Sequence, residues 1–299
     1  LPSYLRILVR LPWLLILLFK NRKSIKHLDL ISLQVFIGYE AYKHFFRKHK
    51  NLVPLIISDL SPSLLMQWSG ALAADNKIMW WQDDYHHFKG FSNENYMPFT
   101  CHYAAVLNQH GFETVKDKCP KAKVYLRYKT NIKPFKTDIL KPRLGIAVNA
   151  SFMATKHQIN LLDQIKQQLK LSNVYLRLHP NSKICNKDFE EDWITIAPKK
   201  ETLEVYIQKV DLVVVGNSAV QLKLLCEGIP VIHIEDLDAF EFDLYGYCKL
   251  DFSYGIQSDL TKISWAGVNK FYKDKQIQVK LNDYVNVNEK LPFLKEFKL

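Results

Sequence analysis

Residues 211–235 carry the clearest hydrophobic pattern in the chain. Residues 212–215 form a short run of leucine and valine, long enough for one buried strand of a parallel sheet. The Gly-Asn pair at 216–217 interrupts the run, Ser218 opens an amphipathic helical segment, and a glycine and a proline end that segment. The next apolar run, 231–234, predicts a second strand. This pattern is typical of a strand–helix–strand unit in a doubly wound parallel sheet.

A similar alternation of apolar runs and amphipathic segments extends along most of the chain. The apolar runs predict strands at 53–58, 77–81, 104–107, 124–126, 144–148, 174–178, 194–196, 212–215 and 231–234. Apolar faces at helical spacing predict helices at 28–50, 63–74, 159–169, 203–209, 218–227 and 260–274. Because strands alternate with helices in both halves, the predicted fold class is α/β.

The length of the chain and one irregular stretch divide this pattern into two domains. A chain of 299 residues suits two domains of ordinary size, and 48% hydrophobic residues can supply two cores. Residues 129–143 carry prolines and lysines with little periodicity, so we expect a hinge there. The sequence therefore predicts two Rossmann-like domains that face each other across a cleft, the first over residues 1–135 and the second over residues 136–299.

The positive charge of the chain is concentrated near its beginning. Residues 1–50 hold ten Lys/Arg and two acidic residues, which is +8 of the net charge of +11. Residues 11–19 are wholly apolar, a run too short for a membrane-spanning helix of about 20 residues. Lysine and arginine follow this run instead of a signal-peptide cleavage site. We therefore expect contact with an anionic membrane surface, with a core helix of the first domain as the equal alternative.

Two further observations restrict the class of protein. The five cysteines show no CxxC or paired spacing, so we expect a reducing compartment and no disulfide framework. No zinc-finger, RRM or related signature accompanies the basic residues, so nucleic acid is not an expected partner. Together these features predict a cytoplasmic protein that is peripheral at the inner face of the membrane.

Polar side chains follow two of the predicted strands at their carboxyl ends. His179-Pro180 comes directly after the strand at 174–178, and Asn217-Ser218 after the strand at 212–215. We expect the two strands to be consecutive in one parallel sheet, which would bring His179 and Ser218 to the same edge. Ser218 would lie at a helix N-terminus, where backbone N–H groups bind anions. The alternatives are a plain helix cap for Ser218 and a structural role for His179.

The His-Pro pair, followed further along by a strand, Gly-Asn-Ser, a helix and Glu-Gly-Ile-Pro-Val-Ile, resembles bacterial transferases that use CMP-activated sugars. That group includes sialyl-, polysialyl- and Kdo-type capsule and lipopolysaccharide enzymes, and the resemblance covers mainly residues 144–235. It implies a GT-B glycosyltransferase whose first domain binds a glycan or glycolipid acceptor and whose second domain binds the CMP-sugar. The candidate donor-binding residues are Asn149, Arg177, His179, Pro180, Asn217 and Ser218.

This resemblance implies a metal-independent, inverting transfer of an acidic sugar, with no cofactor. As the sugar leaves, negative charge grows on the phosphate of CMP. Helix N–H groups, the Ser218 hydroxyl and a donor from His179 would stabilise that charge, which makes His179 a catalytic candidate. Arg177 precedes His179 by two residues and shares its face of the strand. Transferases that use CDP-glycerol carry a similar His/Ser pair, so polyol-phosphate transfer is the alternative reaction.

The acceptor hydroxyl needs a base, and the strand at 77–81 ends in a polar cluster. Asp83 or Asp84 is the predicted catalytic base, because a carboxylate there could take the proton directly. The remaining acceptor-side candidates are Asp59, Gln82, His86 and His87. The alternative is that this cluster caps a helix or binds the acceptor.

Several other site types lack their sequence signature. No HxxxH or HExxH spacing supports a metal site, and loop acidity explains the Asp-Leu-Asp triplet at 236–238. Neither half contains G-x-G-x-x-G or a G-x-S-x-G nucleophile elbow. Two hypotheses remain: a CMP-sugar-dependent glycosyltransferase or CDP-glycerol-type polyol-phosphate transferase, and a non-catalytic, membrane-associated assembly module.

Overall fold

A computed structural model of the chain describes residues 12, 30–57, 62–82, 100–189, 191–238, 242–257 and 259–287. Several residues singled out in the sequence lie outside the described residues: the apolar run at 11–19 except Pro12, and Asp59, Asp83, Asp84, His86 and His87. The described residues fall into two compact units, and each is described by itself below. The described chain passes from the first unit to the second between Tyr128 and Lys129.

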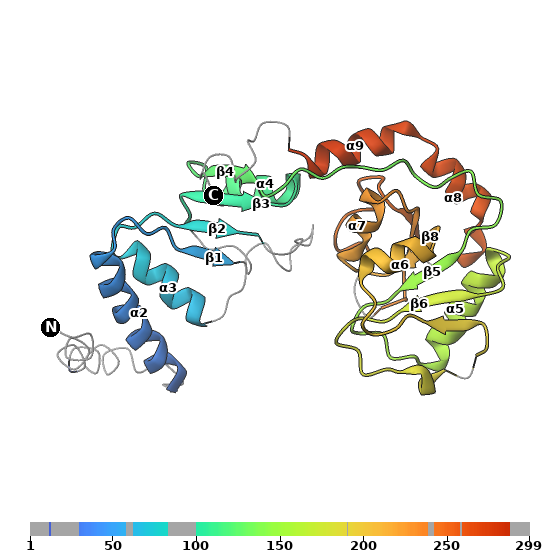
Figure 1. The fold of residues 1–299 in the computed structure, drawn as a ribbon, viewed down its shortest axis with the longest axis horizontal. Helices are drawn as coiled ribbons and strands as arrows, with labels where there is room; N and C mark the ends of the chain where they lie inside the picture. The colour runs from blue at the N-terminus through green and yellow to red at the C-terminus, as the bar shows by residue number, and fades with distance from the viewer. Residues whose placement is uncertain are drawn as a thin grey trace. The chain divides into compact units, whose positions relative to one another are not determined.

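The first unit is a four-stranded parallel sheet with helices packed on it (Figure 1). Its strands are hydrogen-bonded in chain order, all parallel: β1 (Leu55–Ile57), β2 (Met79–Trp81), β3 (Tyr103–Val106) and β4 (Lys123–Leu126). Its helices are α2 (Leu30–Lys48), α3 (Pro62–Leu72) and α4 (Gln109–Lys118). The sequence patterns did not predict α4, although the Asn108 side chain caps it by accepting the Gly111 N–H at 2.9 Å.

The second unit contains a six-stranded, wholly parallel sheet in the order β10-β9-β8-β5-β6-β7. The strands are β5 (Leu144–Ala147), β6 (Val174–Arg177), β7 (Ile194–Ile196), β8 (Leu212–Val215), β9 (Val231–Ile234) and β10 (Tyr254–Ile256). Numbered from β5, this is the order 3-2-1-4-5-6 of a Rossmann sheet, and the strand order reverses between β5 and β8. In such sheets, ligands bind at the carboxyl ends of the strands near this reversal.

The helices of the second unit connect and cover this sheet. They are α5 (Lys156–Gln168), α6 (Leu203–Lys209), α7 (Val220–Cys226), α8 (Trp265–Tyr272) and α9 (Lys275–Val285), with short 3-10 turns at Asn186–Asp188 and Leu260–Lys262. All residues of β5, β8 and β9 are buried, which explains why these strands are continuous apolar runs in the sequence. The strand–helix–strand unit predicted at 211–235 is present as β8–α7–β9, with β8 and β9 paired in parallel.

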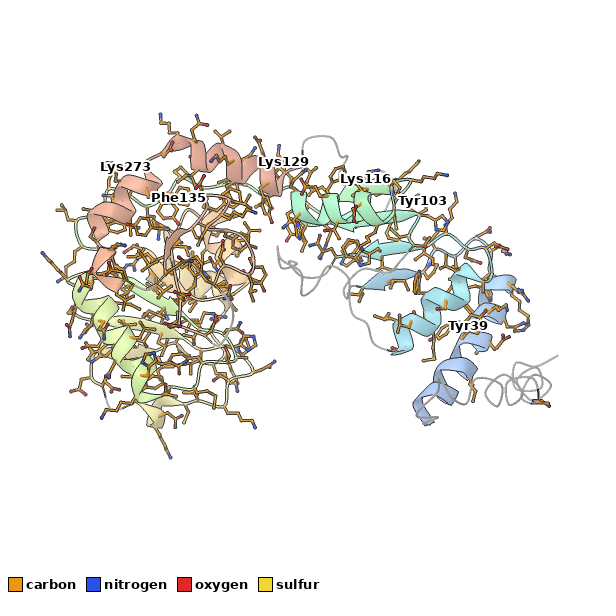
Figure 2. The ribbon with its side chains drawn as sticks, turned by 180° about the vertical axis from the view of Figure 1, so that it is seen from behind. Tyr39, Tyr103, Lys116, Lys129, Phe135 and Lys273 are labelled. Carbon is orange, nitrogen blue, oxygen red and sulfur yellow. The ribbon has the colours of Figure 1, made fainter. Side chains whose placement is uncertain are left out.

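The stretch that we expected to be a hinge packs along part of its length on the second unit. The Lys133 N–H donates to the Cys226 carbonyl at 2.9 Å, and the Lys136 N–H donates to the Gly228 carbonyl at 2.8 Å. Phe135, labelled in Figure 2, places its ring 4.6 Å from the ring of Tyr272. The predicted boundary at 135/136 therefore falls inside a segment that belongs to the second unit. The division of roles between two domains stays a prediction.

Gly228 shows how the end of α7 and this segment depend on each other. Its φ is +74°, a left-handed conformation that favours glycine. A Cβ at this position would also lie 2.2 Å from the carbonyl oxygen of Pro134. The glycine that the sequence pattern identified as a helix stop is thus also a point where segment 130–136 lies against the backbone that follows α7.

The relative position of two key strands differs from our expectation. We expected the strands that end at His179 and Ser218 to be consecutive in the sheet. The structure places β5 between β6 and β8, so this prediction is wrong. Both strands still end at the same edge, because all strands of the sheet are parallel.

Hydropathy and helix length bear on membrane insertion. None of the helices in the described residues is both long and apolar enough to cross a membrane.

Candidate functional site

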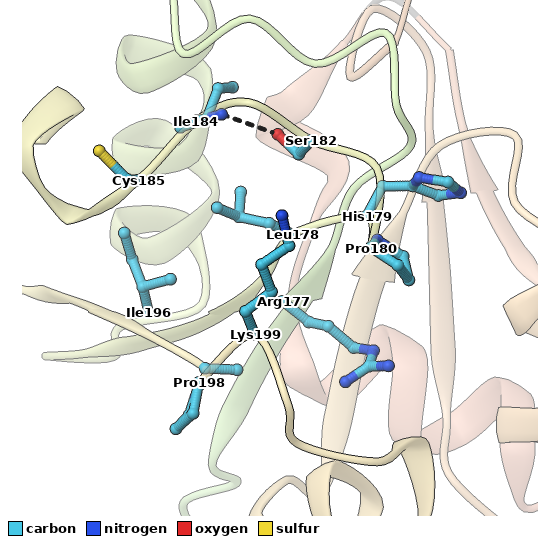
Figure 3. Close-up of a pocket in the computed structure, with 11 residues that line it drawn as sticks. Arg177, Leu178, His179, Pro180, Ser182, Ile184, Cys185, Ile196, Pro198 and Lys199 are labelled. Atoms are coloured by element: carbon cyan, nitrogen blue, oxygen red, sulfur yellow. Dashed lines mark hydrogen bonds between the residues drawn. The ribbon is translucent and has the colours of Figure 1, made fainter.

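A pocket of about 340 Å³ opens at the carboxyl ends of β6 and β7 (Figure 3). It is lined by Arg177, Leu178, His179, Pro180, Ser182, Ile184, Cys185, Ile196, Ala197, Pro198 and Lys199. Apolar side chains from both strand ends form part of the wall, and two permanent cations and an imidazole form another part. Among the described residues, no carboxylate lines the pocket. A cavity with apolar walls and uncompensated positive charge suits an anionic ligand that has an apolar portion.

His179 is oriented by the turn that follows it. Its Nδ1 accepts the Asn181 N–H at 3.2 Å, and its carbonyl accepts the Ser182 N–H at 2.8 Å. Because Nδ1 is an acceptor, the proton of the neutral imidazole lies on Nε2. His179 therefore has an Nε2–H group available to donate to a ligand.

Arg177 projects on the same side of the chain as His179 (Figure 3). Its Nη1 donates to the backbone carbonyl of Glu201 at 2.9 Å, and its guanidinium lies 5.7 Å from the ring centre of Tyr206. Among the described residues, no carboxylate forms an ion pair with Arg177. Its positive charge therefore remains available to a phosphate or carboxylate group of a ligand.

Lys199 enters the pocket from the turn that follows β7. The Glu201 N–H donates to the Pro198 carbonyl at 2.8 Å and closes this turn around Lys199. Sequence reasoning did not identify Lys199, Ser182 or Cys185. The carboxyl end of the predicted strand at 194–196 was the available signal for Lys199, since it is the same type of position that drew attention to His179.

The Ser218 region is organised differently, because most of its polar groups bind other parts of the protein. The Asn217 N–H donates to the Asp238 carboxylate, and the Asn217 Oδ1 accepts the Leu244 N–H at 2.7 Å. Asn149 Nδ2 donates to the Asn217 carbonyl at 2.7 Å and so links the ends of β5 and β8. Asn217 is 4% exposed. Its side chain serves the loop itself.

Ser218 is half-buried and does not cap the helix that follows it. The N-cap residue of α7 is Ala219, which makes no side-chain cap, and helix α7 begins at Val220. The Ser218 Oγ accepts the Val220 N–H at a long distance of 3.4 Å. The plain helix cap that we gave as the alternative role of Ser218 is therefore not formed, and α7 has only seven residues.

The sheet register relates Ser218 to the pocket. Ala147 of β5 is paired with both Arg177 of β6 and Val215 of β8, so the ends of these strands lie level. Two inter-strand spacings separate β6 from β8, roughly 10 Å. Asn149, Asn217 and Ser218 do not line the pocket that contains Arg177, His179 and Pro180. The structure brings the donor-site candidates to one edge but divides them into two groups.

A buried network of hydrogen bonds contacts the loop at 216–218 through the Gly216 carbonyl. Gln221 Nε2 donates to the Gly216 carbonyl at 2.8 Å and lies 3.0 Å from Nδ1 of His233. The Asp243 N–H donates to His233 Nε2 at 3.2 Å, and Ser253 donates to Gln221 Oε1 at 3.0 Å. Burial lowers the pKa of His233, and the nearby carboxylates of Asp243 and Asp238 oppose that shift. The network holds this loop in one conformation.

Asp238 of the Asp-Leu-Asp triplet and Gln82 both accept backbone hydrogen bonds inside the fold. Asp238 is buried and accepts hydrogen bonds from Asn217, as described above, and Asp236 adopts a φ of +67°. Within the described residues, no group of three or more His, Cys, Asp or Glu side chains could hold a metal ion. Gln82 is 0% exposed, and its Oε1 accepts the Leu107 N–H at 2.9 Å inside the first unit.

Comparison with known proteins identifies the fold. No protein-family model and no curated protein matches the sequence. Among solved structures, the chain is similar to a Listeria monocytogenes protein described as a UDP-N-acetylglucosamine 2-epimerase (TM-score 0.56, 9% identity, 86% of this chain and 76% of that chain). It is also similar to MurG from Acinetobacter baumannii (TM-score 0.51, 10% identity, 89% of this chain and 77% of that chain).

These identities are low, so the likeness establishes the fold and leaves the reaction open. The chain has a GT-B-like α/β fold with two parallel sheets, as the sequence resemblance predicted. A fold of this kind hosts more than one reaction, and the reaction must be argued from the site.

Proposed function

We propose that the protein is a glycosyltransferase that moves an acidic sugar of the Kdo or nonulosonic acid type from a CMP-sugar to a bacterial surface glycan. The observation that carries this proposal is the pocket at the ends of β6 and β7. It combines apolar walls with Arg177, His179 and Lys199, and the part of the chain that the structure describes contributes no carboxylate to it. A nucleotide has the matching chemistry, because the faces of its base are apolar and its phosphate is anionic.

In this proposal the nucleotide occupies the pocket and its phosphate lies toward His179. The acceptor hydroxyl attacks the anomeric carbon of the sugar, and the bond from that carbon to the phosphate oxygen breaks. The configuration at the anomeric carbon inverts, and CMP leaves with the bonding electrons. The Nε2–H of His179 and the Arg177 guanidinium stabilise the charge that grows on the leaving phosphate.

The proton of the acceptor hydroxyl needs a separate base. Asp83 or Asp84 remains the proposed base, with Asp59 as the reserve candidate, and these positions lie outside the described residues. A base that acts only on the acceptor affects turnover much more than nucleotide affinity. Measurement of both quantities for Asp83→Asn and Asp84→Asn would therefore locate the base.

The identity of the base as cytosine is the part of the proposal that rests on the His-Pro and Gly-Asn-Ser motifs. Isothermal calorimetry with CMP, CDP, UMP and UDP tests it directly. We expect CMP to bind most tightly. Tighter binding of CDP would favour the polyol-phosphate alternative, and tighter binding of UDP would exclude a CMP-sugar donor. A chain that binds none of the four would fit the non-catalytic assembly module.

We also propose that the protein is peripheral at an anionic membrane surface. The sequence of residues 1–50 supports this location, and so do described residues at the end of α2. Phe45, Leu52 and Val53 are 44%, 46% and 39% exposed, and the exposed Arg47 and Lys48 lie beside them in the chain. Exposed apolar side chains next to basic ones suit an anionic lipid interface.

Vesicle sedimentation tests the membrane proposal. We expect binding to phosphatidylglycerol vesicles that weakens as salt increases, and little binding to phosphatidylcholine vesicles. Equal binding to both, or none to either, would contradict it. Arg47→Gln/Lys48→Gln should weaken binding more than Lys118→Gln/Lys121→Gln, which removes the same charge from another exposed part of the first unit.

A further inference from the structure

Glu201 does not itself line the pocket, but its backbone contacts both segments that carry the cationic lining residues Arg177 and Lys199. Its N–H donates to the Pro198 carbonyl at 2.8 Å and closes the turn that carries Lys199. Its carbonyl accepts a hydrogen bond from Arg177 Nη1 at 2.9 Å. One residue therefore binds the Arg177 side chain, from the end of β6, and closes the backbone turn of Lys199, after β7.

The carboxylate of Glu201 binds two residues that do not line the pocket, Tyr175 of β6 and Lys209 of α6. The side chain is 4% exposed and forms an ion pair with Lys209 of α6. The Tyr175 hydroxyl lies 3.0 Å and 2.9 Å from its two oxygens, and Lys209 also donates to the Tyr175 hydroxyl at 2.9 Å. The interaction with Glu201 raises the pKa of Lys209. Strand β6, helix α6 and the turn after β7 are thus tied together at one carboxylate.

The aromatic rings of Tyr175 and Tyr206 add a rigid support beside Arg177. The two rings are stacked, with centres 5.6 Å apart and planes 17° apart. Tyr206 is completely buried, and its hydroxyl donates to the Tyr175 carbonyl at 3.4 Å. The Arg177 guanidinium lies over the Tyr206 ring. Arg177 is therefore held by a neutral carbonyl and an aromatic face.

The way Glu201 holds Arg177 has an electrostatic consequence. A carboxylate bound to Arg177 would compensate its charge, and a ligand phosphate would have to compete with that carboxylate. Glu201 offers Arg177 its uncharged carbonyl, while its carboxylate is compensated by Lys209. The pocket thus keeps its positive charge although a glutamate lies next to it.

We propose that Glu201 is a positioning residue that holds Arg177 and Lys199 in the geometry needed to bind the phosphate of the nucleotide. This inference rests on the proposed function, since it assigns the phosphate to the same pocket. It adds a residue that does not line the pocket and that the strand-end logic of the sequence did not identify.

The sign of one mutational effect separates positioning from simple electrostatics. Removal of a negative charge near an anion site would, by charge alone, strengthen anion binding. Glu201→Ala keeps the backbone N–H and carbonyl but removes the carboxylate that binds Tyr175 and Lys209 and so fixes the position of that backbone. If Glu201 positions the cations, the displaced carbonyl should lose its hydrogen bond to Arg177, and CMP binding should weaken by roughly tenfold or more, the usual range for a hydrogen bond to a charged group. Binding of cytidine, which has no phosphate, should stay unchanged. Glu201→Gln keeps an acceptor for Tyr175 and should retain most of the CMP affinity.

The control is Glu204→Ala, which removes an exposed glutamate in α6, three residues further along. CMP affinity should stay constant or increase slightly in this variant. A double-mutant cycle with Arg177→Gln completes the design: if Glu201 acts through Arg177, the two substitutions together should cost less than the sum of their separate effects.

The experiment is calorimetric titration of the full chain and these variants with CMP and with cytidine. If Glu201→Ala does not fold, Tyr175→Phe/Lys209→Met removes the partners of the carboxylate and should weaken CMP binding in the same direction. An unchanged or increased CMP affinity, or equal losses for CMP and cytidine, would overturn this inference while leaving the proposed function intact. Absence of CMP binding by the unaltered chain would overturn both.

Discussion

The carboxyl ends of β6 and β8 carry polar residues at the same edge of one sheet, yet their hydrogen-bonding groups are used differently. After β8, Asn217 is buried and hydrogen-bonded to Asp238, Leu244 and Asn149. After β6, His179 and Arg177 line a pocket and keep donor groups that their hydrogen bonds to Asn181 and Glu201 do not use. A polar residue at a strand end is therefore a candidate for ligand binding only when the fold has not already satisfied its hydrogen bonds.

This comparison predicts opposite consequences for substitutions at the two strand ends. Changes after β6 should affect ligand binding and turnover with little effect on stability. Changes in the buried hydrogen bonds after β8 should affect stability first, and Ser218, which is half-buried there, should affect turnover only weakly. Four experiments test this contrast, and they follow in decreasing order of expected effect.

His179→Ala should give the largest effect. Loss of one donor to a leaving group typically lowers the rate by about 10²–10³-fold, and we expect a loss of this size in turnover with an unchanged melting temperature. The measurement is steady-state transfer from a CMP-sugar, together with thermal unfolding. His157→Ala is the control, because His157 is an exposed histidine on α5. Normal turnover in His179→Ala would remove this residue from the mechanism.

Asp238→Asn should lower stability at neutral pH by about 2 kcal/mol, because the buried Asn217 donors lose a charged acceptor. Urea denaturation measures this change. Asp236→Asn is the matched control: Asp236 is exposed, and asparagine tolerates its positive φ as aspartate does. If both substitutions have equal effects, the loop after β8 is not held together by Asp238.

His233 of β9 allows a pH test of the buried network that contacts the loop after β8. Its pKa is lowered in the folded protein by burial, so below about pH 6.5 the unfolded chain binds a proton that the folded chain resists. Stability should therefore fall as the pH decreases below that value. The measurement is the free energy of unfolding from neutral pH to about pH 5, and His233→Asn should remove this part of the slope. An identical slope in the variant would contradict the assignment.

Ser218→Ala should give the smallest effect, a loss of roughly 2- to 10-fold in turnover, the range for one ordinary hydrogen bond. The hydroxyl is half-buried, lies outside the pocket lining and already accepts the Val220 N–H. The same transfer assay as for His179→Ala applies. A loss as large as that of His179→Ala would show that the two strand ends act on the ligand as equals.

Local sequence patterns were sufficient for much of the second unit. β7, α6, β8 and β9 were predicted at their observed bounds. β8 and β9 are buried strands dominated by apolar residues, β7 alternates apolar and polar residues as Ile-Thr-Ile, and α6 is a short capped segment. Helix α9 was not predicted, although Ile277, Leu281 and Val285 recur at helical spacing and Asp274 caps it. In this case the signal was present in the sequence but was masked by the polarity of the segment.

The sequence by itself determined the alternation of strands and helices, the parallel sheets, and the polar residues at strand ends, including Arg177 and His179. These features depend on residues that are close together in the chain. Only the tertiary structure decided that β5 lies between β6 and β8, that Asn217 is saturated by Asp238 and Leu244, and that Glu201 links Arg177 to the turn of Lys199. These features depend on strand order and on hydrogen bonds between distant residues, and no local periodicity encodes them.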